Sequence, residues 1–297
     1  MRKRLLIGPV LIVALVAAFW LDELIDAWVL PDFLHPLLGG RDTPPPGTLL
    51  FLIAIPLIVL AARELTAMLR ANGIAASNRV GSIAALLGLC VTAFIPATLE
   101  AGTAAAAIST TAVVVLLASL TFYSRHRSFE GALSLAGAAL LSFVYLGLLA
   151  GFFIAIRRDH SAWLVLAVLV TTKSCDIGAY FTGTAIGKHK LIIWLSPGKT
   201  WEGLAGGVVA AMIVGALSGW ILGFPEPGPR ALWLGAIAGI LFALVGQLGD
   251  LLESLFKRDA QLKDAGQSIP GFGGVLDLLD SPLLVAPVAY WWITLLS

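Results

Sequence analysis

Long apolar stretches alternate with short polar ones along the whole of this 297-residue chain. An α-helix needs about 20 mostly apolar residues to cross the hydrocarbon core of a membrane, and nine stretches approach or exceed that length with hardly any charge. They cover residues 5–20, 48–62, 83–97, 103–123, 131–156, 162–183, 201–224, 231–249 and 276–296. We therefore predict an all-α, polytopic integral membrane protein with about nine transmembrane helices.

The composition supports this prediction and excludes two other classes of protein. Hydrophobic residues make up 59% of the chain and charged residues only 12%, whereas soluble domains carry about 25% charge. The formal net charge is +1, too small for the basic field with which proteins hold nucleic acid, so we expect no nucleic-acid partner. Cys90 and Cys175 have no cysteine or histidine at ligand spacing, which argues against a disulfide framework or a zinc site.

The basic residues predict an orientation in the membrane. The first apolar stretch follows Arg2, Lys3 and Arg4, and we interpret it as a retained signal anchor with a cytoplasmic N-terminus. Of the 19 Lys and Arg residues, the outer side then receives only Arg41, Arg157, Arg158 and Arg230. This bias agrees with the positive-inside rule, although the adjacent arginines 157 and 158 run against it.

Polar residues at membrane depth are concentrated in the second half of the chain. We interpret residues 1–160 as about five spans that act as a scaffold and face lipid, and residues 161–297 as a catalytic region of about four spans with cytoplasmic polar loops. Residues 63–82 mix apolar side chains with arginine, and we expect them to lie on the inner membrane surface as the second helix ends. Because polar groups in a membrane are costly, their concentration in the second half predicts that the site lies there.

The first polar cluster is at residues 171–180. Thr172, Asp176 and Tyr180 recur every four residues, so a helix would place them on one face, where they could line a shared cavity. Lys173 and Asp176 are three residues apart, and the alternative is that they only neutralise each other.

The second polar cluster is at residues 183–203 and contains Lys188 and Glu202. Its Ser-Pro-Gly-Lys-Thr sequence, residues 196–200, leads into the next apolar stretch. The hydroxyls of Ser196 and Thr200, the ammonium group of Lys199 and the free N–H groups of a helix start suit a phosphate. The alternative is an N-cap beside a lysine that reaches to the membrane surface.

The third cluster, at residues 249–281, is the most informative. If the eighth stretch continues as a helix to residue 257, one of its faces carries Asp250, Glu253, Ser254 and Lys257. The start of the last stretch places three more polar residues on one face, namely Asp277, Asp280 and Ser281. Hard carboxylates without histidine or thiolate select Mg²⁺ over zinc, and Mg²⁺ usually binds a few carboxylates together with substrate phosphates. The cluster predicts phosphoryl or nucleotidyl transfer at the cytoplasmic surface; the alternative is a solvated loop with ordinary salt pairs.

Together the three clusters resemble the phosphatidate cytidylyltransferase family, also called CDP-diacylglycerol synthases. The family signature S-x-x-K-R-x4-K-D-x-G-x2-[LIF]-P-G-H-G-G-x-x-D-R-x-D is matched by Ser254, Lys257, Arg258, Lys263, Asp264, Gly266, Ile269, Pro270, Gly271, Gly273, Gly274, Asp277 and Asp280. Upstream blocks at 176–180, 187–188 and 196–203 extend the resemblance to roughly residues 171–281. Phe272 and Leu278 replace a histidine and an arginine of the signature, which removes an imidazole and a bidentate phosphate donor. We expect a divergent active member, with an altered substrate or an inactive relative as alternatives.

The resemblance implies that the chain transfers CMP from CTP to phosphatidic acid in the membrane, releasing pyrophosphate, at the cytoplasmic face of a bacterial-type inner membrane. It implies Mg²⁺ as the cofactor, with a second metal ion or K⁺ as a further option, bound by Asp250 and Asp277 and supported by Asp280. The catalytic residues it suggests are Asp250, Asp277, Lys257, Arg258, Lys263 and Asp264. The substrate-binding residues it suggests are Asp176, Tyr180, Lys188, Ser196, Lys199, Thr200, Glu202, Ser254, Gly273 and Gly274.

Other functions remain open from the sequence. A related CTP-dependent enzyme could act on another lipid, either as an ether-lipid cytidylyltransferase or as an isoprenoid alcohol kinase. An ion-coupled secondary transporter is a different class, but transporters commonly contain paired repeats with broken helices, and no internal repeat is visible here. The glycine pairs 203/207 and 235/239 predict close helix packing, within the bundle in preference to a homodimer.

Overall fold

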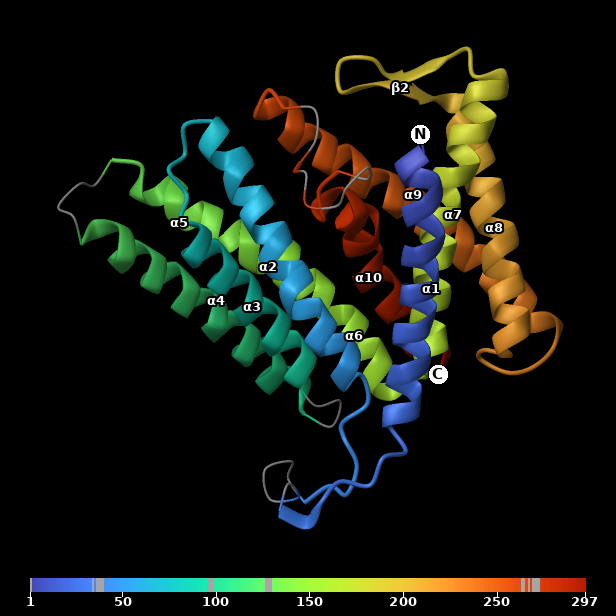
Figure 1. Ribbon diagram of the computed structural model, residues 1–297, viewed down its shortest axis with the longest axis horizontal. Helices are drawn as coiled ribbons and strands as arrows, with labels where there is room; N and C mark the ends of the chain where they lie inside the picture. Colours follow the sequence, from blue (N-terminus) through green and yellow to red (C-terminus); the bar gives the residue numbers. More distant parts are fainter. Residues whose placement is uncertain are drawn as a thin grey trace.

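The computed structural model is a bundle of long helices, drawn in Figure 1. It describes residues 2–33, 35, 40–95, 99–125, 130–262, 265–266, 268 and 273–297, with the backbone alone for residues 2–7. Within these ranges, eight helical segments are long and apolar enough to cross a membrane. The predicted all-α membrane architecture is therefore confirmed.

The helices follow the predicted apolar stretches in order. Those of the first half are α1 (Arg2–Ile25), α2 (Thr48–Ala71), α3 (Asn78–Phe94), α4 (Ala101–Ser124), α5 (Ala132–Leu141) and α6 (Leu149–Asp159), with the π-helical segment η2 (Ser142–Leu148) joining α5 to α6 in one span. Those of the second half are α7 (Ala162–Ile186), α8 (Trp201–Leu222), α9 (Pro229–Asp259) and α10 (Leu276–Leu296). The predicted span at residues 83–97 corresponds to α3, which is apolar but shorter than these eight segments.

Helix α2 differs from its prediction at the C-terminal end. It continues to Ala71, so the first part of the segment 63–82 is a continuation of the span and does not lie along the membrane surface. The reason is burial: Leu65 and Met68 join a core cluster that includes Leu276 of α10. Packing against α10 therefore outweighs the amphipathic pattern that the arginines give this segment.

A two-stranded antiparallel sheet lies between α7 and α8 and was not predicted. Strands β1 (Lys190–Ile192) and β2 (Ser196–Thr200) form a hairpin in which Lys190 pairs with Thr200. The last residue of β2 also caps α8, because the Thr200 hydroxyl accepts a hydrogen bond from the Gly203 N–H. Figure 1 places this hairpin at the same end of the bundle as the start of α1. The strand and the helix are therefore joined without a flexible linker.

Glycine lets the helices of the second half touch through their backbones. A Cβ atom at Gly239 would lie 2.1 Å from the Ala211 carbonyl oxygen of α8, and one at Gly207 would lie 2.7 Å from the Cys175 carbonyl oxygen of α7. The predicted glycine pairs thus serve contacts inside the bundle, as expected. Small residues allow such close approach in membranes, where no hydrophobic force drives helices together.

The first half uses the same device around its π-helical segment. A Cβ at Gly147 of η2 would lie 2.2 Å from the Ala85 carbonyl oxygen of α3, and a Cβ at Gly88 would meet the Phe143 carbonyl oxygen at 2.3 Å. This contact fixes η2 against α3. The two halves meet where α10 packs on α6 and α2, and where α1 packs on α7.

The end of the bundle opposite the hairpin is held by a buried ion cluster around Arg157. Its Nε donates to an Asp22 carboxylate oxygen at 2.6 Å, and its guanidinium also pairs with Asp26 and Glu23 of the α1 region. Arg157 is only 2% exposed. Acids of the α1 region therefore neutralise Arg157, and Arg158 pairs with Asp159, so both arginines that run against the positive-inside rule have an acidic partner.

We predict that Arg157→Ala will strongly destabilise the fold, because it leaves buried Asp22 without its cation. The expected loss is about 3 kcal/mol in the free energy of unfolding, measured by equilibrium unfolding in mixed detergent micelles. Arg230→Ala is the matched control: Arg230 pairs with Glu226 on the exposed surface, where such a pair contributes about 1 kcal/mol or less. Equal stability of the two variants would contradict the structural role of Arg157.

Candidate active site

Three carboxylates from two helices converge near the hairpin end of the bundle. Asp250 and Glu253 lie on one face of α9 and Asp280 lies on α10, and one oxygen from each falls within 4.8 Å of the others. Backbone contact brings the helices together here, since a Cβ at Gly249 would lie 2.5 Å from the Asp280 carbonyl oxygen. Glu253 is fully buried, at 0% exposure. The two acidic faces predicted from the sequence therefore meet.

Three lysines bind this acidic group from different elements. Lys173 of α7 lies between Asp176, at 3.1 Å, and Asp280, at 3.3 Å. Lys199 of β2 pairs with Asp250 at 2.6 Å. Lys257 of α9 pairs with Glu253 and lies 3.0 Å from an Asp277 oxygen. These ion pairs join α7, α9, α10 and the hairpin into one charged network.

The network carries more negative than positive charge. Five carboxylates face three ammonium groups across these contacts, which leaves a formal excess of two negative charges. Within the described residues, the Oε1 atom of Glu253 has no hydrogen-bond donor. An excess of this size in a partly dry site is costly, and an all-oxygen donor set suits Mg²⁺. Asp250, Glu253 and Asp280 therefore fit a divalent cation.

Asp277 is held beside this trio by the loop that precedes α10. The Gly274 N–H donates to an Asp277 carboxylate oxygen at 2.7 Å, and Asp277 also lies beside Glu253. Gly273 has a positive φ of 97°, and a Cβ there would lie 2.6 Å from the same Asp277 side chain. Glycine at this position thus lets the loop turn over the carboxylate. The structure places Asp277 at the site through Lys257 and Glu253.

Glu64 of α2 anchors the same loop, and the sequence analysis missed it. Its carboxylate accepts hydrogen bonds from the N–H groups of Val275 at 3.0 Å and Leu276 at 2.8 Å, and from the Ser268 hydroxyl. A Cβ at Gly274 would lie 2.5 Å from a Glu64 oxygen. A carboxylate at the first N–H groups of α10 satisfies donors that a helix leaves free. The sequence did contain a signal, a glutamate within a predominantly apolar helix. We did not single it out because we expected residues 63–82 to lie on the membrane surface.

Tyr145 of η2 is a second residue that the sequence did not reveal. Its side chain is buried against Phe256, with ring centroids 5.5 Å apart. Its hydroxyl is close enough to interact with the charges of Asp280, Glu253 and Asp250, and has no hydrogen-bond partner among the described residues. π-Helical segments often occur at functional sites. The first half of the chain therefore also contributes side chains to the site.

A cavity of about 400 Å³ opens beside the charged network. Its polar lining includes Asp176, Lys199, Gln247 and Asp250, and its apolar walls include Ala179 and Leu204. Tyr180 and Thr200 line it as well, so four of the predicted substrate-binding residues reach one space. Thr172, predicted on the same helix face, instead bonds to the Val168 carbonyl and does not line the cavity.

The remaining predicted site residues have other positions. Glu202 accepts hydrogen bonds from the N–H groups of Lys188 and His189 and so holds the turn before the hairpin. Arg258 donates from Nε to the Leu195 carbonyl at 3.2 Å, which ties the hairpin tip to α9. Ser196 begins β2 and Ser254 lies on α9. Lys263, Asp264 and Phe272 lie outside the described residues.

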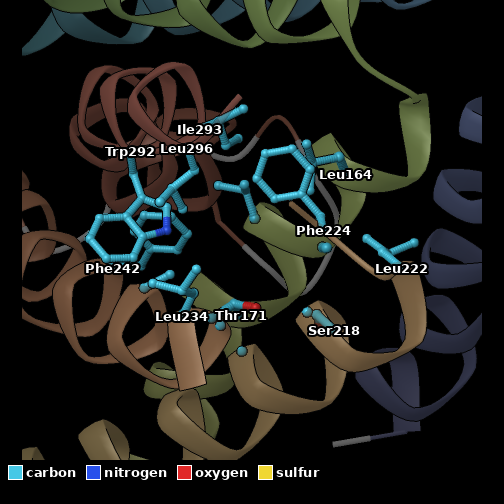
Figure 2. Close-up of a pocket in the computed structure, with 16 residues that line it drawn as sticks. Leu164, Thr171, Ser218, Leu222, Phe224, Leu234, Phe242, Trp292, Ile293 and Leu296 are labelled. Atoms are coloured by element: carbon cyan, nitrogen blue, oxygen red, sulfur yellow. The ribbon is translucent and has the colours of Figure 1, made fainter. Parts of the chain in front are cut away.

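A second cavity, shown in Figure 2, lies among helices α7, α8, α9 and α10, at the end of these helices that is far from the hairpin. It holds only about 50 Å³ and is lined by apolar side chains such as Phe224, Phe242 and Trp292, with Thr171 and Ser218 as its polar residues. No charged residue lines it. The chemistry of the described residues is therefore concentrated in the larger cavity.

Comparison with known proteins identifies the family. Residues 43–296 match the cytidylyltransferase family. This chain belongs to the cytidylyltransferase family. The match includes Glu64 and Tyr145 as well as the network of lysines and carboxylates, so the site lies wholly within the family region.

Several relatives of this cytidylyltransferase carry the same name. The phosphatidate cytidylyltransferase of Staphylococcus haemolyticus is 36% identical over 260 residues, covering 86% of this chain and 92% of that protein. The phosphatidate cytidylyltransferase of Bacillus subtilis is 37% identical over 163 residues, 54% of this chain and 59% of that protein. The one from Synechocystis is 45% identical over 125 residues, 41% of this chain and 40% of that protein.

We predict that Glu64→Ala will loosen the loop before α10, because two backbone N–H groups lose a charged acceptor. Hydrogen exchange should accelerate at the amides of Val275 and Leu276, and the free energy of unfolding should fall by about 2 kcal/mol. The control is Glu100→Ala, since Glu100 precedes α4 without capping it through its side chain. Unchanged exchange at both amides would show that Glu64 does not hold the loop.

Proposed function

We propose that this chain is a phosphatidate cytidylyltransferase, which forms CDP-diacylglycerol and pyrophosphate from CTP and phosphatidate. The observation that carries the proposal is the network of three lysines and five carboxylates beside a cavity in a membrane-spanning member of the cytidylyltransferase family. Phosphates on both substrates need cationic side chains and a bound metal, and the network offers ligands for each. The relatives' names support the choice of substrates.

In the proposed reaction, an oxygen of the phosphatidate phosphate attacks the α-phosphorus of CTP. A new P–O bond joins the lipid phosphate to CMP, and the bond to the β-phosphate breaks with its electron pair, so that pyrophosphate leaves. The attacking oxygen is already ionised, and no side chain has to remove a proton from it. Catalysis then consists mainly of positioning the two substrates and neutralising their charge.

The lysines of the network are placed for that neutralisation. Lys199 lines the cavity and is paired with Asp250, so it can exchange a carboxylate oxygen for a phosphate oxygen. Lys173 and Lys257 each contact two carboxylates, which holds their ammonium groups beside Asp280 and Glu253. Magnesium held by Asp250, Glu253 and Asp280, with Asp277 alongside, would neutralise phosphate charge and polarise the reacting phosphorus.

The two departures from the family signature leave this chemistry in place. Leu278 lies on α10 between Asp277 and Asp280, and Phe272 precedes the turn at Gly273. Neither position supplies a carboxylate of the network. We therefore propose that the chain is an active member of the family, in which the lysines of the network donate hydrogen bonds to phosphate where the signature has an arginine.

The charged network also suggests an orientation. Lys199 of the network is part of the hairpin, and Figure 1 shows the hairpin at the same end of the bundle as the start of α1 and the end of α2, two segments with several arginines in the sequence. By the positive-inside rule this end faces the cytoplasm, where CTP is available. We infer a bacterial-type inner-membrane enzyme with a cytoplasmic active site and a cytoplasmic N-terminus.

The direct test is turnover by the purified protein in detergent. With CTP, dioleoyl phosphatidate and Mg²⁺ we expect release of pyrophosphate and a CDP-diacylglycerol band on thin-layer chromatography, both abolished by EDTA and restored by added Mg²⁺. Formation of CDP together with a phosphorylated lipid alcohol would instead identify a kinase. Absence of product with a well-folded sample that still binds CTP would refute the proposed activity.

Replacing network carboxylates should remove activity and leave the fold intact. We predict that Asp250→Asn and Asp277→Asn will each lower kcat by about 10³-fold or more, because each loses a charged ligand or lysine partner at the site. Glu226→Gln, in an exposed pair at the opposite end of α9, should keep full activity. An Asp277→Asn enzyme with normal turnover would overturn the assignment of this carboxylate.

A further inference from the structure

Gln247 of α9 lines the cavity beside the network, and its side chain has a buried hydrogen-bond donor that no described residue uses. The residue is 8% exposed and lines the cavity together with Asp176, Lys199 and Asp250. Within the part of the chain that the structure describes, its Nε2 group has no acceptor. Buried donors without partners are rare in folded proteins because each costs the loss of its hydration. A ligand in the cavity is the natural source of the missing acceptor.

The position of Gln247 along α9 narrows down that ligand. Gln247 precedes Asp250 by three residues, so it lies about 4.5 Å further from the hairpin end and deeper in the bundle. The cavity lining also includes the apolar residues Ala179 and Leu204. An acceptor that reaches Gln247 therefore belongs to a molecule whose charged end is at Lys199 and whose next part is uncharged.

We propose that the Gln247 amide donates a hydrogen bond to an acyl ester carbonyl of the lipid substrate, and that this contact makes the enzyme select diacyl over dialkyl ether lipids. The proposal rests on the proposed function. With the lipid phosphate near Lys199, the glycerol unit places the ester carbonyls only a few bonds deeper, at the level of Gln247. A neutral amide donor matches a neutral carbonyl acceptor, whereas a phosphate oxygen in the cavity would pair with Lys199.

An ether lipid lacks the carbonyl and would leave the donor of Gln247 unpaired. Sites that hydrogen-bond a substrate group discriminate against analogues without it, because the buried partner then stays unsatisfied. The expected preference for ester over ether lipid is about tenfold in kcat/KM, because leaving one buried donor without a hydrogen bond costs a free energy that corresponds to about a tenfold change. Gln247 thus acts on lipid choice and not on the bond that is made or broken.

The experiment compares two phosphatidic acids with the same oleyl-length chains, one ester-linked and one ether-linked, in detergent with CTP and Mg²⁺. The wild type should prefer the ester by about tenfold. In Gln247→Leu, kcat/KM for the ester should fall to about that of the ether lipid, while the value for the ether lipid and the KM for CTP stay unchanged. Gln247→Met, which keeps the unbranched shape, should behave in the same way. Leu248→Ala, on the exposed side of α9, should keep the wild-type ratio.

The outcomes separate this inference from the proposed function. A wild type that forms CDP-diacylglycerol but uses both lipids equally would overturn the role of Gln247 and leave the activity standing. If Gln247→Leu lowers kcat/KM equally for both lipids, Gln247 contacts a group that the two lipids share, and the proposed contact is wrong. If the variant raises the KM for CTP and leaves the ester-to-ether ratio unchanged, Gln247 contacts the nucleotide, and the proposed contact is again wrong. A wild type that makes no CDP-diacylglycerol would refute the proposed function and this inference with it.

Discussion

The pairing of charge at membrane depth is the constraint on which this structure depends. Unpaired ions are so costly in a low-dielectric environment that each lysine near the cavity is bound to one or two carboxylates, as Lys173 is to Asp176 and Asp280. These pairs come from α7, α9, α10 and the hairpin, so charge neutralisation also fixes how those elements sit together. The same groups that would meet substrate phosphates hold the site in shape beforehand, which reduces reorganisation during the reaction.

The first half of the chain is part of the site and not only its support. Glu64 holds the loop that presents Asp277, and Tyr145 packs against Phe256 of α9, the helix that carries Asp250 and Glu253. Both depend on close packing, since the η2 segment that carries Tyr145 is fixed by contact between Gly147 and α3. A substitution that moves η2 away from α3 would therefore alter the site, even though it lies far from the cavity and changes none of the residues that line it.

The sequence predicted features that depend on local spacing and missed those that depend on distant contacts. Helical periodicity placed Asp250 and Glu253 on one face, and the apolar stretches located the spans, because both follow from a short segment alone. Glu64 meets Val275 across 211 residues, and no local pattern reveals such a partner. Gln247 and Tyr145 were invisible for the same reason, since an uncharged polar residue in an apolar helix shows its role only when its neighbours are known. Arg157 contradicted the orientation rule until Asp22 was seen beside it.

The bond between Glu64 and α10 has a consequence for biosynthesis. Helix α2 is synthesised well before α10, so the Glu64 carboxylate has no partner from α10 until that helix has inserted. Until then Asp280 and Asp277, which α10 carries, are missing and α9 holds its acids alone. The nascent chain thus has no complete charged network, and the carboxylates come together only when α10 docks against α9.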